Sequence, residues 1–299
     1  MKIHPIISCV SIWFIALWLT SCGAVQEPVS PWPKRVMITN DDGIDSPGIK
    51  ALALAFAQVA DTYVVAPLED QSGTGHNMIH METDELAVKS RDFGEGIQAY
   101  AVDGLPADCV VLALTGIMRD NPPDLVVSGI NSGPNVGTAW VASGTIGAAR
   151  IAALAGIPAI AASGTMVDSV DVAAQWVVDL AYSAVVQELQ PPQFLTVSFP
   201  KVSASLIKGI RVTEHTDLDE IPIFEKVPDA RPDSERDVWK ITGEQRFEER
   251  RSSESDAVLL NQGYVAVVPM RADEHDYTLL ADMQNHVERL PDWPTALVS

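Results

Sequence analysis

Cysteine is scarce in this chain of 299 residues, which contains only Cys9, Cys22 and Cys109. Because two of the three lie within the first 22 residues, the remainder of the chain has no internal disulfide framework, and small disulfide-rich folds are excluded. Cys109 falls in an apolar helical segment. There we expect a buried structural thiol rather than a nucleophile.

Positive charge is scarce as well. The 20 Lys and Arg residues are outnumbered by 40 Asp and Glu residues, which gives a formal net charge of −20. An overall field of this sign repels a long polyanion, so we expect no long nucleic acid as a partner. A small phosphorylated substrate is easier to accept, especially where a metal ion supplies the missing positive charge.

Several familiar site motifs are absent. The chain has no P-loop Gly-Lys-Ser/Thr, no GxGxxG dinucleotide pattern and no internal repeat. His76 and His80 lie four residues apart, the spacing of a helical zinc-binding pair, but no carboxylate stands in a zincin-like arrangement. We therefore expect ordinary loop residues here, with metal ligation as the alternative.

A long hydrophobic run is missing too. The apolar run of residues 5–19 is short for a membrane-spanning helix of about 20 residues, and Leu19-Thr-Ser-Cys22 follows it. The pattern resembles a bacterial lipoprotein signal. It predicts cleavage after residue 21, lipidation of Cys22 and a proline-containing tether over 22–33.

This interpretation implies a protein attached to a membrane by its N-terminal lipid, at the cell envelope and facing the periplasm or the exterior. An uncleaved N-terminal anchor and a soluble secreted product are the alternatives.

After this segment, short apolar strands alternate with helical patterns, which predicts a doubly wound, mostly parallel α/β sheet over residues 34–200. Helices are expected from Pro47 to Ala60, over Ala107–Met118, from Ser143 to Ala155 and over Val170–Leu189. The expected strands are Val36–Thr39, Tyr63–Pro67, Ala99–Val102, Asp124–Val127, Pro158–Ala162, Phe194–Phe199 and Tyr264–Pro269.

The character of the chain changes after residue 200. Charges crowd and Pro222, Pro228 and Pro232 interrupt any helix. We expect residues 201–260 to form a projecting arm or hairpin that a partner subunit covers. Residues 261–299 then hold a return strand and a C-terminal segment.

Oxygen-bearing side chains follow the first expected strand directly. Val36–Thr39 runs into Asn40, Asp41, Asp42 and Gly43. Ligands bind outside the carboxyl ends of strands in an α/β sheet, so these carboxylates favour a divalent-ion or phosphate site. The alternative is a solvated Asn-Asp-Asp-Gly turn.

Three more polar loops follow later strands: Ser72-Gly73, the loop 128–137 with Asn131 and Asn135, and Ser143-Gly144-Thr145 at the start of a helix. Exposed N–H groups and amide oxygens in such loops suit an anion or a metal. Taken singly, Ser72-Gly73 is a flexible loop and Ser143 an N-cap. Four such loops on one rim of a parallel sheet predict a shared site.

The order and spacing of these segments over residues 35–165 resemble the SurE-like 5′/3′-nucleotidases, also called survival protein E or stationary-phase survival acid phosphatases. The resemblance is looser beyond residue 200. The matching segments are Thr39–Gly43 with Pro47-Gly48, Val64–Pro67 with Ser72-Gly73, Pro106–Val110, Pro123–Asn131 with Gly133–Gly137, and Ser143–Thr145.

The resemblance implies a Rossmann-like core and a C-terminal oligomerisation arm that builds a homodimer or homotetramer. It also implies a divalent ion, Mg²⁺ or Mn²⁺, held by Asp41, Asp42, Ser72 and Asn131. Around the phosphate it places Asn40, Gly73, Asn135, Ser143, Gly144 and Thr145. Asn40, Asp41 and Asp42 are the expected catalytic residues.

We therefore expect a metal-dependent phosphomonoesterase that hydrolyses nucleoside monophosphates by metal-assisted attack of water on the phosphate. The general base stays open between Asp42 and a hydroxide on the metal, because no histidine falls in a matching motif.

Two other classes remain open. One is a lipid-anchored nucleotide- or metal-binding protein without catalysis, motivated by Leu105 and Ala142 at positions where the family commonly has threonine and an aromatic residue. The other is a phosphatase with an aspartyl nucleophile, although that class usually shows Asp-x-Asp after a strand.

Overall fold

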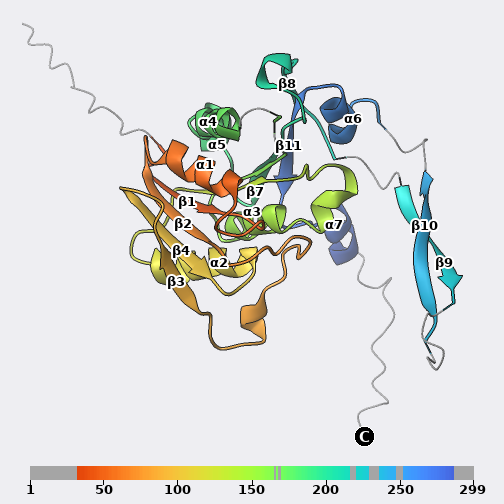
Figure 1. The fold of residues 1–299 in the computed structure, drawn as a ribbon, viewed down its shortest axis with the longest axis horizontal. Helices are drawn as coiled ribbons and strands as arrows, with labels where there is room; N and C mark the ends of the chain where they lie inside the picture. Colours follow the sequence, from red (N-terminus) through yellow and green to blue (C-terminus); the bar gives the residue numbers. More distant parts are fainter. Residues whose placement is uncertain are drawn as a thin grey trace, which may run out of the picture. The chain divides into compact units, whose positions relative to one another are not determined.

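The computed structural model describes residues 32–164, 166–167, 170–215, 220–228, 236–246 and 252–285. Within these ranges one sheet has nine strands (Figure 1). Across the sheet, neighbouring strands follow the order β3 (Val88–Arg91), β4 (Ile97–Val102), β2 (Asp61–Pro67), β1 (Arg35–Thr39), β5 (Leu125–Asn131), β6 (Ala159–Ser163), β7 (Gln193–Ser198), β11 (Val265–Arg271) and β8 (Ile210–Val212).

Strand β1 lies between β2 and β5 and pairs with both in parallel. From β1 the chain builds outward through β2 and β4 on one side, and through β5, β6 and β7 on the other. The strand order thus reverses beside β1, the position where ligands bind in doubly wound sheets. The expected mostly parallel α/β sheet is confirmed; β3, β11 and β8 run in the opposite direction at its two ends.

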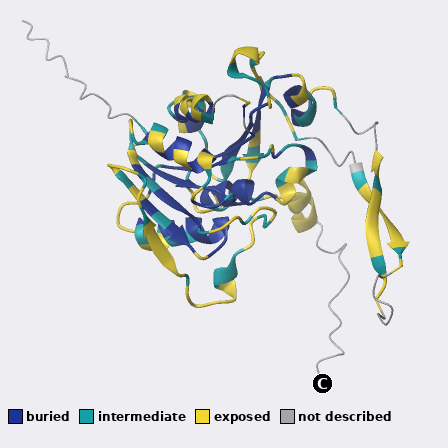
Figure 2. Ribbon diagram, in the orientation of Figure 1, coloured by how far each residue is buried: buried dark blue, intermediate teal, exposed yellow. Residues whose placement is uncertain are grey.

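Helices cover both faces of this sheet (Figure 1). Ile38 of β1 packs in one buried cluster with residues of α1 (Pro47–Phe56), α4 (Val170–Ala181) and α5 (Ala184–Gln187). Met37, its neighbour in the strand, packs in a second cluster with α2 (Pro106–Leu112) and α3 (Gly144–Leu154). Successive strand residues point to opposite faces, so one apolar strand serves both layers. Figure 2 shows the buried residues concentrated in the central strands and the helix faces against them.

Two expected helices are not continuous, and a third, α1, ends at Phe56 rather than at Ala60. The segment expected over 107–118 is α2 followed by a π-helical turn, η2 (Ala113–Ile117). The segment expected over 170–189 is divided into α4 and α5 at Ser183, whose backbone is extended and whose hydroxyl donates to the Leu180 carbonyl at 2.6 Å. A serine that bonds to its local backbone competes with the helix and ends it here.

The region after residue 200 contributes to both sheets. β8 pairs in parallel with β11, and β11 pairs antiparallel with β7. Between β8 and α6 (Asp256–Asn261), the strands β9 (Glu220–Val227) and β10 (Val238–Arg246) form a separate antiparallel sheet. The hairpin therefore includes fewer residues than the arm expected over 201–260, because β8 belongs to the main sheet, where it pairs with β11. The helix α7 (Tyr277–Asn285) follows β11.

The two chain segments that flank the hairpin are bonded to each other at its base. The Thr213 hydroxyl donates to the Glu254 carbonyl, and the Asp256 N–H donates to the Glu214 carbonyl at 3.1 Å. We name these four residues the hairpin base.

The expected signal segment 1–21, Cys22 and most of the tether lie outside the described residues. Of the helices in the described ranges, none combines the length and the apolar composition that a membrane crossing requires.

Candidate functional site

Asp41 lies at the carboxyl end of β1, where its side chain is bonded to the start of α3. The Thr145 N–H donates to Asp41 Oδ2 at 3.0 Å, and the Thr145 hydroxyl donates to Oδ1 at 2.5 Å. Asp41 is 3% exposed and Thr145 is fully buried. A residue 104 positions away therefore fixes both oxygens of this carboxylate.

Two glycines of α3 allow this close approach. A Cβ at Gly144 would lie 2.8 Å from Asp41 Cβ and 3.1 Å from Asp41 Oδ2. A Cβ at Gly147 would lie 2.1 Å from the Gly75 carbonyl oxygen, in the loop that follows β2. Any side chain at either position must displace a neighbouring loop, because such distances fall far inside van der Waals contact.

Burial raises the pKa of the Asp41 carboxyl above its ordinary value. The two hydrogen bonds from Thr145 oppose this shift, since they favour the ionised form, and the nearby Asp42 charge adds to the increase. The site thus holds a carboxylate whose charge is costly unless a positive group is close to it.

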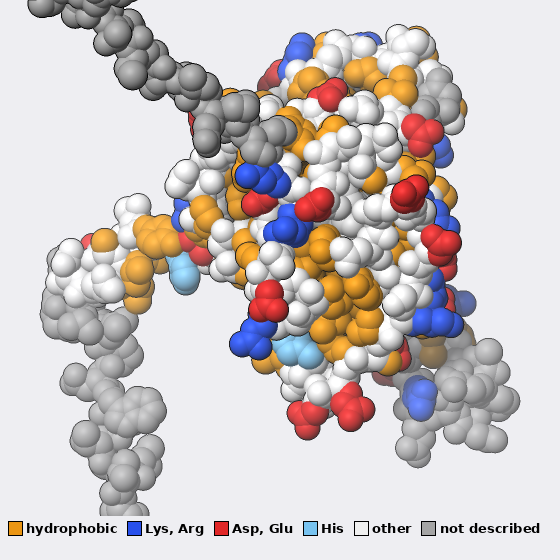
Figure 3. All heavy atoms as spheres, turned by 90° about the vertical axis from the view of Figure 1, so that its left-hand side faces the viewer, with side chains coloured by type: hydrophobic (Ala, Val, Ile, Leu, Met, Phe, Trp, Pro, Cys, Tyr) orange, Lys and Arg blue, Asp and Glu red, His pale blue; other side chains and the backbone are white. Residues whose placement is uncertain are grey.

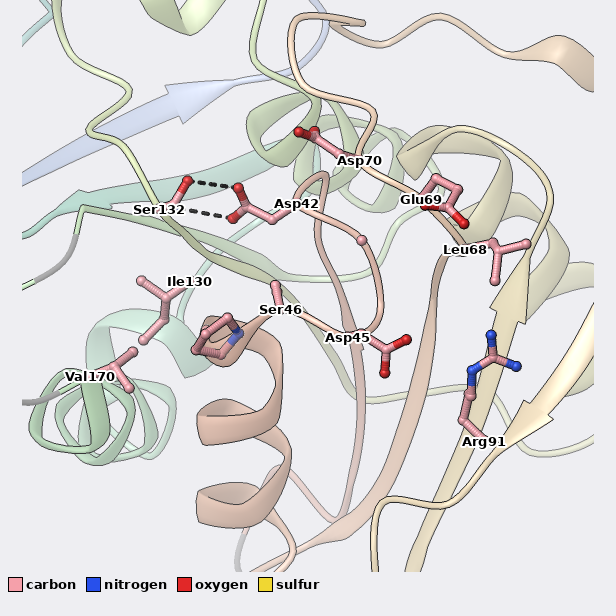
Figure 4. A pocket seen from close by; sticks show the side chains of 13 residues that line it. Asp42, Asp45, Ser46, Leu68, Glu69, Asp70, Arg91, Ile130, Ser132 and Val170 are labelled. Carbon is pink, nitrogen blue, oxygen red and sulfur yellow. Dashed lines mark hydrogen bonds between the residues drawn. The ribbon is translucent and has the colours of Figure 1, made fainter.

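The Asp42 side chain, just after β1, is hydrogen-bonded to Ser132, the residue that follows β5. The Ser132 N–H donates to Asp42 Oδ2 at 2.9 Å and the Ser132 hydroxyl to Oδ1 at 2.8 Å, as Figure 4 shows. Asn131, the last residue of β5, donates its side-chain N–H to the Gly133 carbonyl at 2.7 Å. Its amide oxygen is thereby left to accept from, or coordinate to, a further group.

The loop after β2 joins the same rim. The Gln71 N–H donates to the Asp41 carbonyl at 2.7 Å. The neighbouring Ser72 is exposed; its hydroxyl donates to Asp70 Oδ1 at 2.6 Å and its N–H donates to the same oxygen at 2.8 Å. These bonds, the hydroxyl one foremost, lower the pKa of the Asp70 carboxyl. The Ser72 oxygen keeps its lone pairs for another partner.

The expected phosphate residues have mixed surroundings. Asn40 is buried and its side-chain N–H donates to Gly43 O and Ser46 Oγ, each at 2.8 Å, while its amide oxygen is buried without a partner in the described structure. The Asn135 side-chain N–H donates to Ser163 Oγ at 2.8 Å. The site therefore contains one buried amide oxygen, on Asn40, that a bound group can satisfy.

Two of the expected phosphate donors are already engaged. The Ser143 hydroxyl accepts from the Ile146 N–H at 3.1 Å and so caps α3, which is the simpler alternative for this residue. The Thr145 hydroxyl donates to Asp41, whereas Gly73 is exposed. Ser143 and Thr145 therefore organise the rim.

The oxygen donors of this rim suit a hard divalent cation. No group of three or more His, Cys, Asp or Glu side chains within the described ranges is arranged to hold a metal ion. Two aspartate carboxylates, a serine hydroxyl and an asparagine amide form a different set, all oxygen, which is the donor type that Mg²⁺ and Mn²⁺ prefer. The residues present fit such an ion.

His80 has a structural partner. Its Nδ1 lies 2.6 Å from Oδ1 of the fully buried Asp108, which also accepts the N–H groups of Ile79 and Leu105. The pair ties the loop after β2 to the start of α2.

The sequence analysis missed a second buried pair, His215 and Asp256. His215 Nδ1 lies 2.6 Å from Asp256 Oδ2, and its ring stacks on Trp140 with centroids 5.7 Å apart. Both oxygens of Asp256 also lie within 3.2 Å of the Gly137 N–H. The two residues are 41 positions apart and neither lies in a motif, so the sequence contains no pattern that would indicate the pair.

Two other residues were also missed: Ser132, which orients Asp42, and Asp70, which orients Ser72. Each lies within two positions of an expected ligand. Polar neighbours of a ligand at a strand end are the one signal that could have indicated them.

A family model described as "Survival protein SurE" matches residues 36–219, more than half of the chain. A relative named "5′-nucleotidase SurE 1" from Burkholderia lata is 37% identical over 261 residues, which cover 85% of this chain and 97% of that protein. Another of this name, from Thermus thermophilus, is 41% identical over 246 residues, with 80% and 92% covered.

Among solved structures, the SurE protein from Aquifex aeolicus superposes with a TM-score of 0.69 at 32% identity, covering 84% of this chain and 98% of that one. The α/β fold expected from the sequence is therefore shared with a solved relative.

The relatives also correct the expected localisation. They include the protein named "5′-nucleotidase SurE" from Alkaliphilus metalliredigens. Its match with this chain covers 84% of this chain and 98% of that protein. It and the Burkholderia lata protein are named as nucleotidases, and their names and matched lengths contain nothing that corresponds to an anchored envelope protein. The prediction of a lipid-anchored protein at the cell envelope is wrong, and the alternative of a lipid-anchored binding protein has no support.

Proposed function

We propose, since this chain belongs to the survival protein SurE family, that it is a divalent-metal-dependent phosphomonoesterase acting on nucleoside monophosphates, with phosphate at the 5′ or the 3′ position. One observation carries the proposal. Hydrogen bonds join Asp41, Asp42 and the loops of Ser72 and Asn131 at the carboxyl ends of three adjacent strands.

Asp41, Asp42, Ser72 and Asn131 would hold the metal ion, Mg²⁺ or Mn²⁺. When bound, the ion would offset the negative charge of the phosphoryl oxygens and of the two carboxylates. The raised pKa of Asp41 is consistent with a carboxylate that awaits a positive partner.

The chain's own residues fix the geometry of the reaction. Thr145 and Ser132 hold the carboxylates of Asp41 and Asp42 through two hydrogen bonds each, so neither side chain must reorganise when substrate binds. The Asn40 amide and the amides of the Gly73 and Gly144 segments would lie about the phosphate. Asp42 Oδ1 or Oδ2, on the more exposed carboxylate, would take the proton of the attacking water.

The substrate class follows from charge and size. On the face shown in Figure 3, acidic, basic and hydrophobic side chains are interspersed and no continuous basic groove is visible. The chain carries a net charge of −20. This supports a small phosphate ester over a nucleic acid strand.

The test is release of phosphate by the purified full chain. With Mn²⁺ or Mg²⁺ present, we expect turnover of 5′-AMP, 5′-GMP and 3′-AMP that EDTA abolishes. The Asp41→Asn variant should lose about 10²-fold or more in kcat/KM. A folded parent protein that releases no phosphate from any of the three nucleotides with either metal would refute the proposal.

The hairpin supports the proposal of a homodimer or homotetramer. On one face of the β9–β10 sheet, Phe224 lies opposite Ile241, with Trp239 two residues along the strand. These side chains are 53%, 62% and 56% exposed, respectively. Large apolar side chains clustered on an exposed sheet are typical of a surface that a second subunit covers.

A further inference from the structure

A cavity of about 480 Å³ lies between the loop after β2 and the end of η3. The nine residues of the described chain that line it include His76, Met78 and Met81, and none of the nine is Asp, Glu, Lys or Arg. Val141 and Ala142 line it from the second chain segment. The cavity therefore presents one imidazole and two thioethers, without a carboxylate.

Hydrogen bonds fix the loop that carries these side chains at two points. The Gly75 N–H donates to the Ala142 carbonyl at 2.9 Å. Further along the chain, the N–H groups of residues 79–80 donate to the buried Asp108 carboxylate at 3.0 and 3.1 Å. Met78 lies between these two points, so an ion that binds here has little backbone to order.

The structure separates His76 from His80. Residues 76–78 precede the 3₁₀ helix η1 (Ile79–Met81), and the backbone at residue 78 is extended, so the two histidines do not form the helical pair of a zinc site. His80 does not line this cavity, and its Nδ1 lies 2.6 Å from Asp108 Oδ1. A ligand set in this cavity therefore takes its nitrogen from His76 and its other donors from sulfur.

Burial in the core does not account for the two methionines. Met81 is 76% exposed and Met78 is half-buried, and neither belongs to the two buried clusters. Met37 and Met118, in contrast, are at most 2% exposed and pack in the second cluster. The thioethers of residues 78 and 81 thus contribute little to the core and stay accessible to an ion.

The donor types decide which ion suits the cavity. Thioether sulfur is a soft, neutral ligand that selects Cu(I), and imidazole nitrogen also suits copper, whereas Mg²⁺ and Mn²⁺ prefer carboxylate, carbonyl and water oxygen. Methionine is unbranched and has three rotatable bonds, so two thioethers can close on one ion together with an imidazole. The net charge of −20 favours a cation in general.

We infer that His76, Met78 and Met81 form a binding site for one soft monovalent cation, Cu(I). The site differs in its donors from the oxygen rim at Asp41 and Asp42. The inference goes beyond the proposed function and does not depend on it, because binding of Cu(I) requires no turnover of a nucleotide.

The experiment is a competition titration of the full chain against the Cu(I) chelator bicinchoninate, with Cu(I) added as its acetonitrile complex in the absence of oxygen. All proteins carry Cys9→Ser and Cys22→Ser, because thiolates are soft ligands that would also bind Cu(I). Cys109 is fully buried. We expect one Cu(I) per chain, with one nitrogen and two sulfur neighbours in the copper K-edge absorption spectrum.

Substitutions of the three ligands test the assignment. Met78→Leu, Met81→Leu and His76→Gln should each weaken Cu(I) binding by about 100-fold or more, since loss of a group that only orients a ligand already costs about 10–100-fold. Leucine keeps the approximate volume of methionine, so these variants should fold. Met283→Leu and Glu82→Gln, at exposed positions outside the cavity, are the matched controls and should stay within about twofold of the parent.

Two outcomes would overturn the inference. One is a parent protein that binds Cu(I) no more tightly than the folded Met78→Leu/Met81→Leu double variant. The other is displacement of Cu(I) by excess Mn²⁺, which would place the copper on the carboxylates of the rim. Unchanged Cu(I) affinity in excess Mn²⁺, together with the loss in the double variant, supports a separate soft-metal site.

Discussion

Asp41 is a buried residue whose charge is unfavourable for the fold and whose carboxylate is proposed to bind the metal ion. Its folded pKa is raised by burial, so the protonated form is favoured by folding. Its contribution to stability is therefore present below the unfolded pKa and is lost as the pH rises through the higher folded value. At neutral pH, without a divalent cation, the ionised carboxylate weakens the fold.

The first prediction follows from the upward shift of the Asp41 pKa. In EDTA at pH 7, Asp41→Asn should melt at the temperature of the parent or about 2–5 °C above it. Saturating Mn²⁺ should stabilise the parent, by about 3 kcal/mol at 100 times Kd, and leave the variant nearly unchanged. Differential scanning calorimetry measures both. Equal stabilisation of the two proteins by Mn²⁺ would contradict the role of Asp41 as a ligand.

The second prediction concerns Gly144, whose missing side chain leaves space for Asp41. We expect Gly144→Ala to lower kcat by about tenfold or more, because the added methyl group displaces the carboxylate by a fraction of an ångström to an ångström. At Gly243 a Cβ meets only Ile223 Cδ1 at 3.9 Å, so Gly243→Ala is the matched control and should keep full activity. Parent-like kinetics of Gly144→Ala would show that the contact is relaxed in solution.

At the scale of elements, Asp256 at the start of α6 holds the turn that carries Asn135. Its carboxylate accepts from Gly137, the first residue of the 3₁₀ helix η3 (Gly137–Val141), and pairs with His215. Asp256 is 1% exposed. Removal of its charge leaves His215 and the Gly137 N–H with poorer partners inside the protein.

The third prediction is that Asp256→Asn lowers the free energy of unfolding by about 2–4 kcal/mol and raises KM for AMP several-fold, as the loop of Asn135 loses its fixed position. Urea denaturation and steady-state kinetics measure the two effects. Glu82→Gln should change neither. A stable variant with unchanged KM would show that the loop is held by its other contacts.

The elements that the sequence predicted well are those fixed by local chemistry. β1 is predicted because four residues of strand character, Val36–Thr39, run directly into Asn40, and α3 because Ser143 is a capping residue before a run of small apolar residues. The division of α4 from α5 could not be predicted, since it depends on Ser183 bonding to Leu180 in an otherwise helical pattern. The pairing of β8 with β11 depends on tertiary contacts that no local pattern encodes.

The candidate site could be predicted at the level of its loops but not of its bonds. Strand ends placed Asp41, Asp42 and Asn131 on one rim, because parallel strands share an edge. The sequence could not show that Thr145 donates to Asp41, since the choice between a substrate oxygen and a protein oxygen is made by the packing of α3. The roles of these residues toward metal and phosphate remain predictions.

At the scale of the whole molecule, the apolar face of the hairpin provides the fourth prediction. Figure 2 shows β9 and β10 as largely exposed, in contrast to the buried main sheet. If a second subunit covers this face, Phe224→Glu combined with Trp239→Glu should convert the oligomer to a monomer in light scattering after gel filtration. Gln245→Glu, an exposed polar position on β10, is the control. An unchanged mass would place the subunit interface elsewhere.

The hairpin base has a consequence for how this architecture can diversify. Because Thr213 is bonded to Glu254 and Glu214 to Asp256, the chain leaves the sheet and comes back at a single point. Insertions, deletions or exchange of the hairpin between these two pairs, with His215 kept as the partner of Asp256, would leave the strand order untouched. New assembly states could thus arise by grafting a different hairpin, while the loops at the carboxyl ends of β1, β2 and β5 are inherited intact.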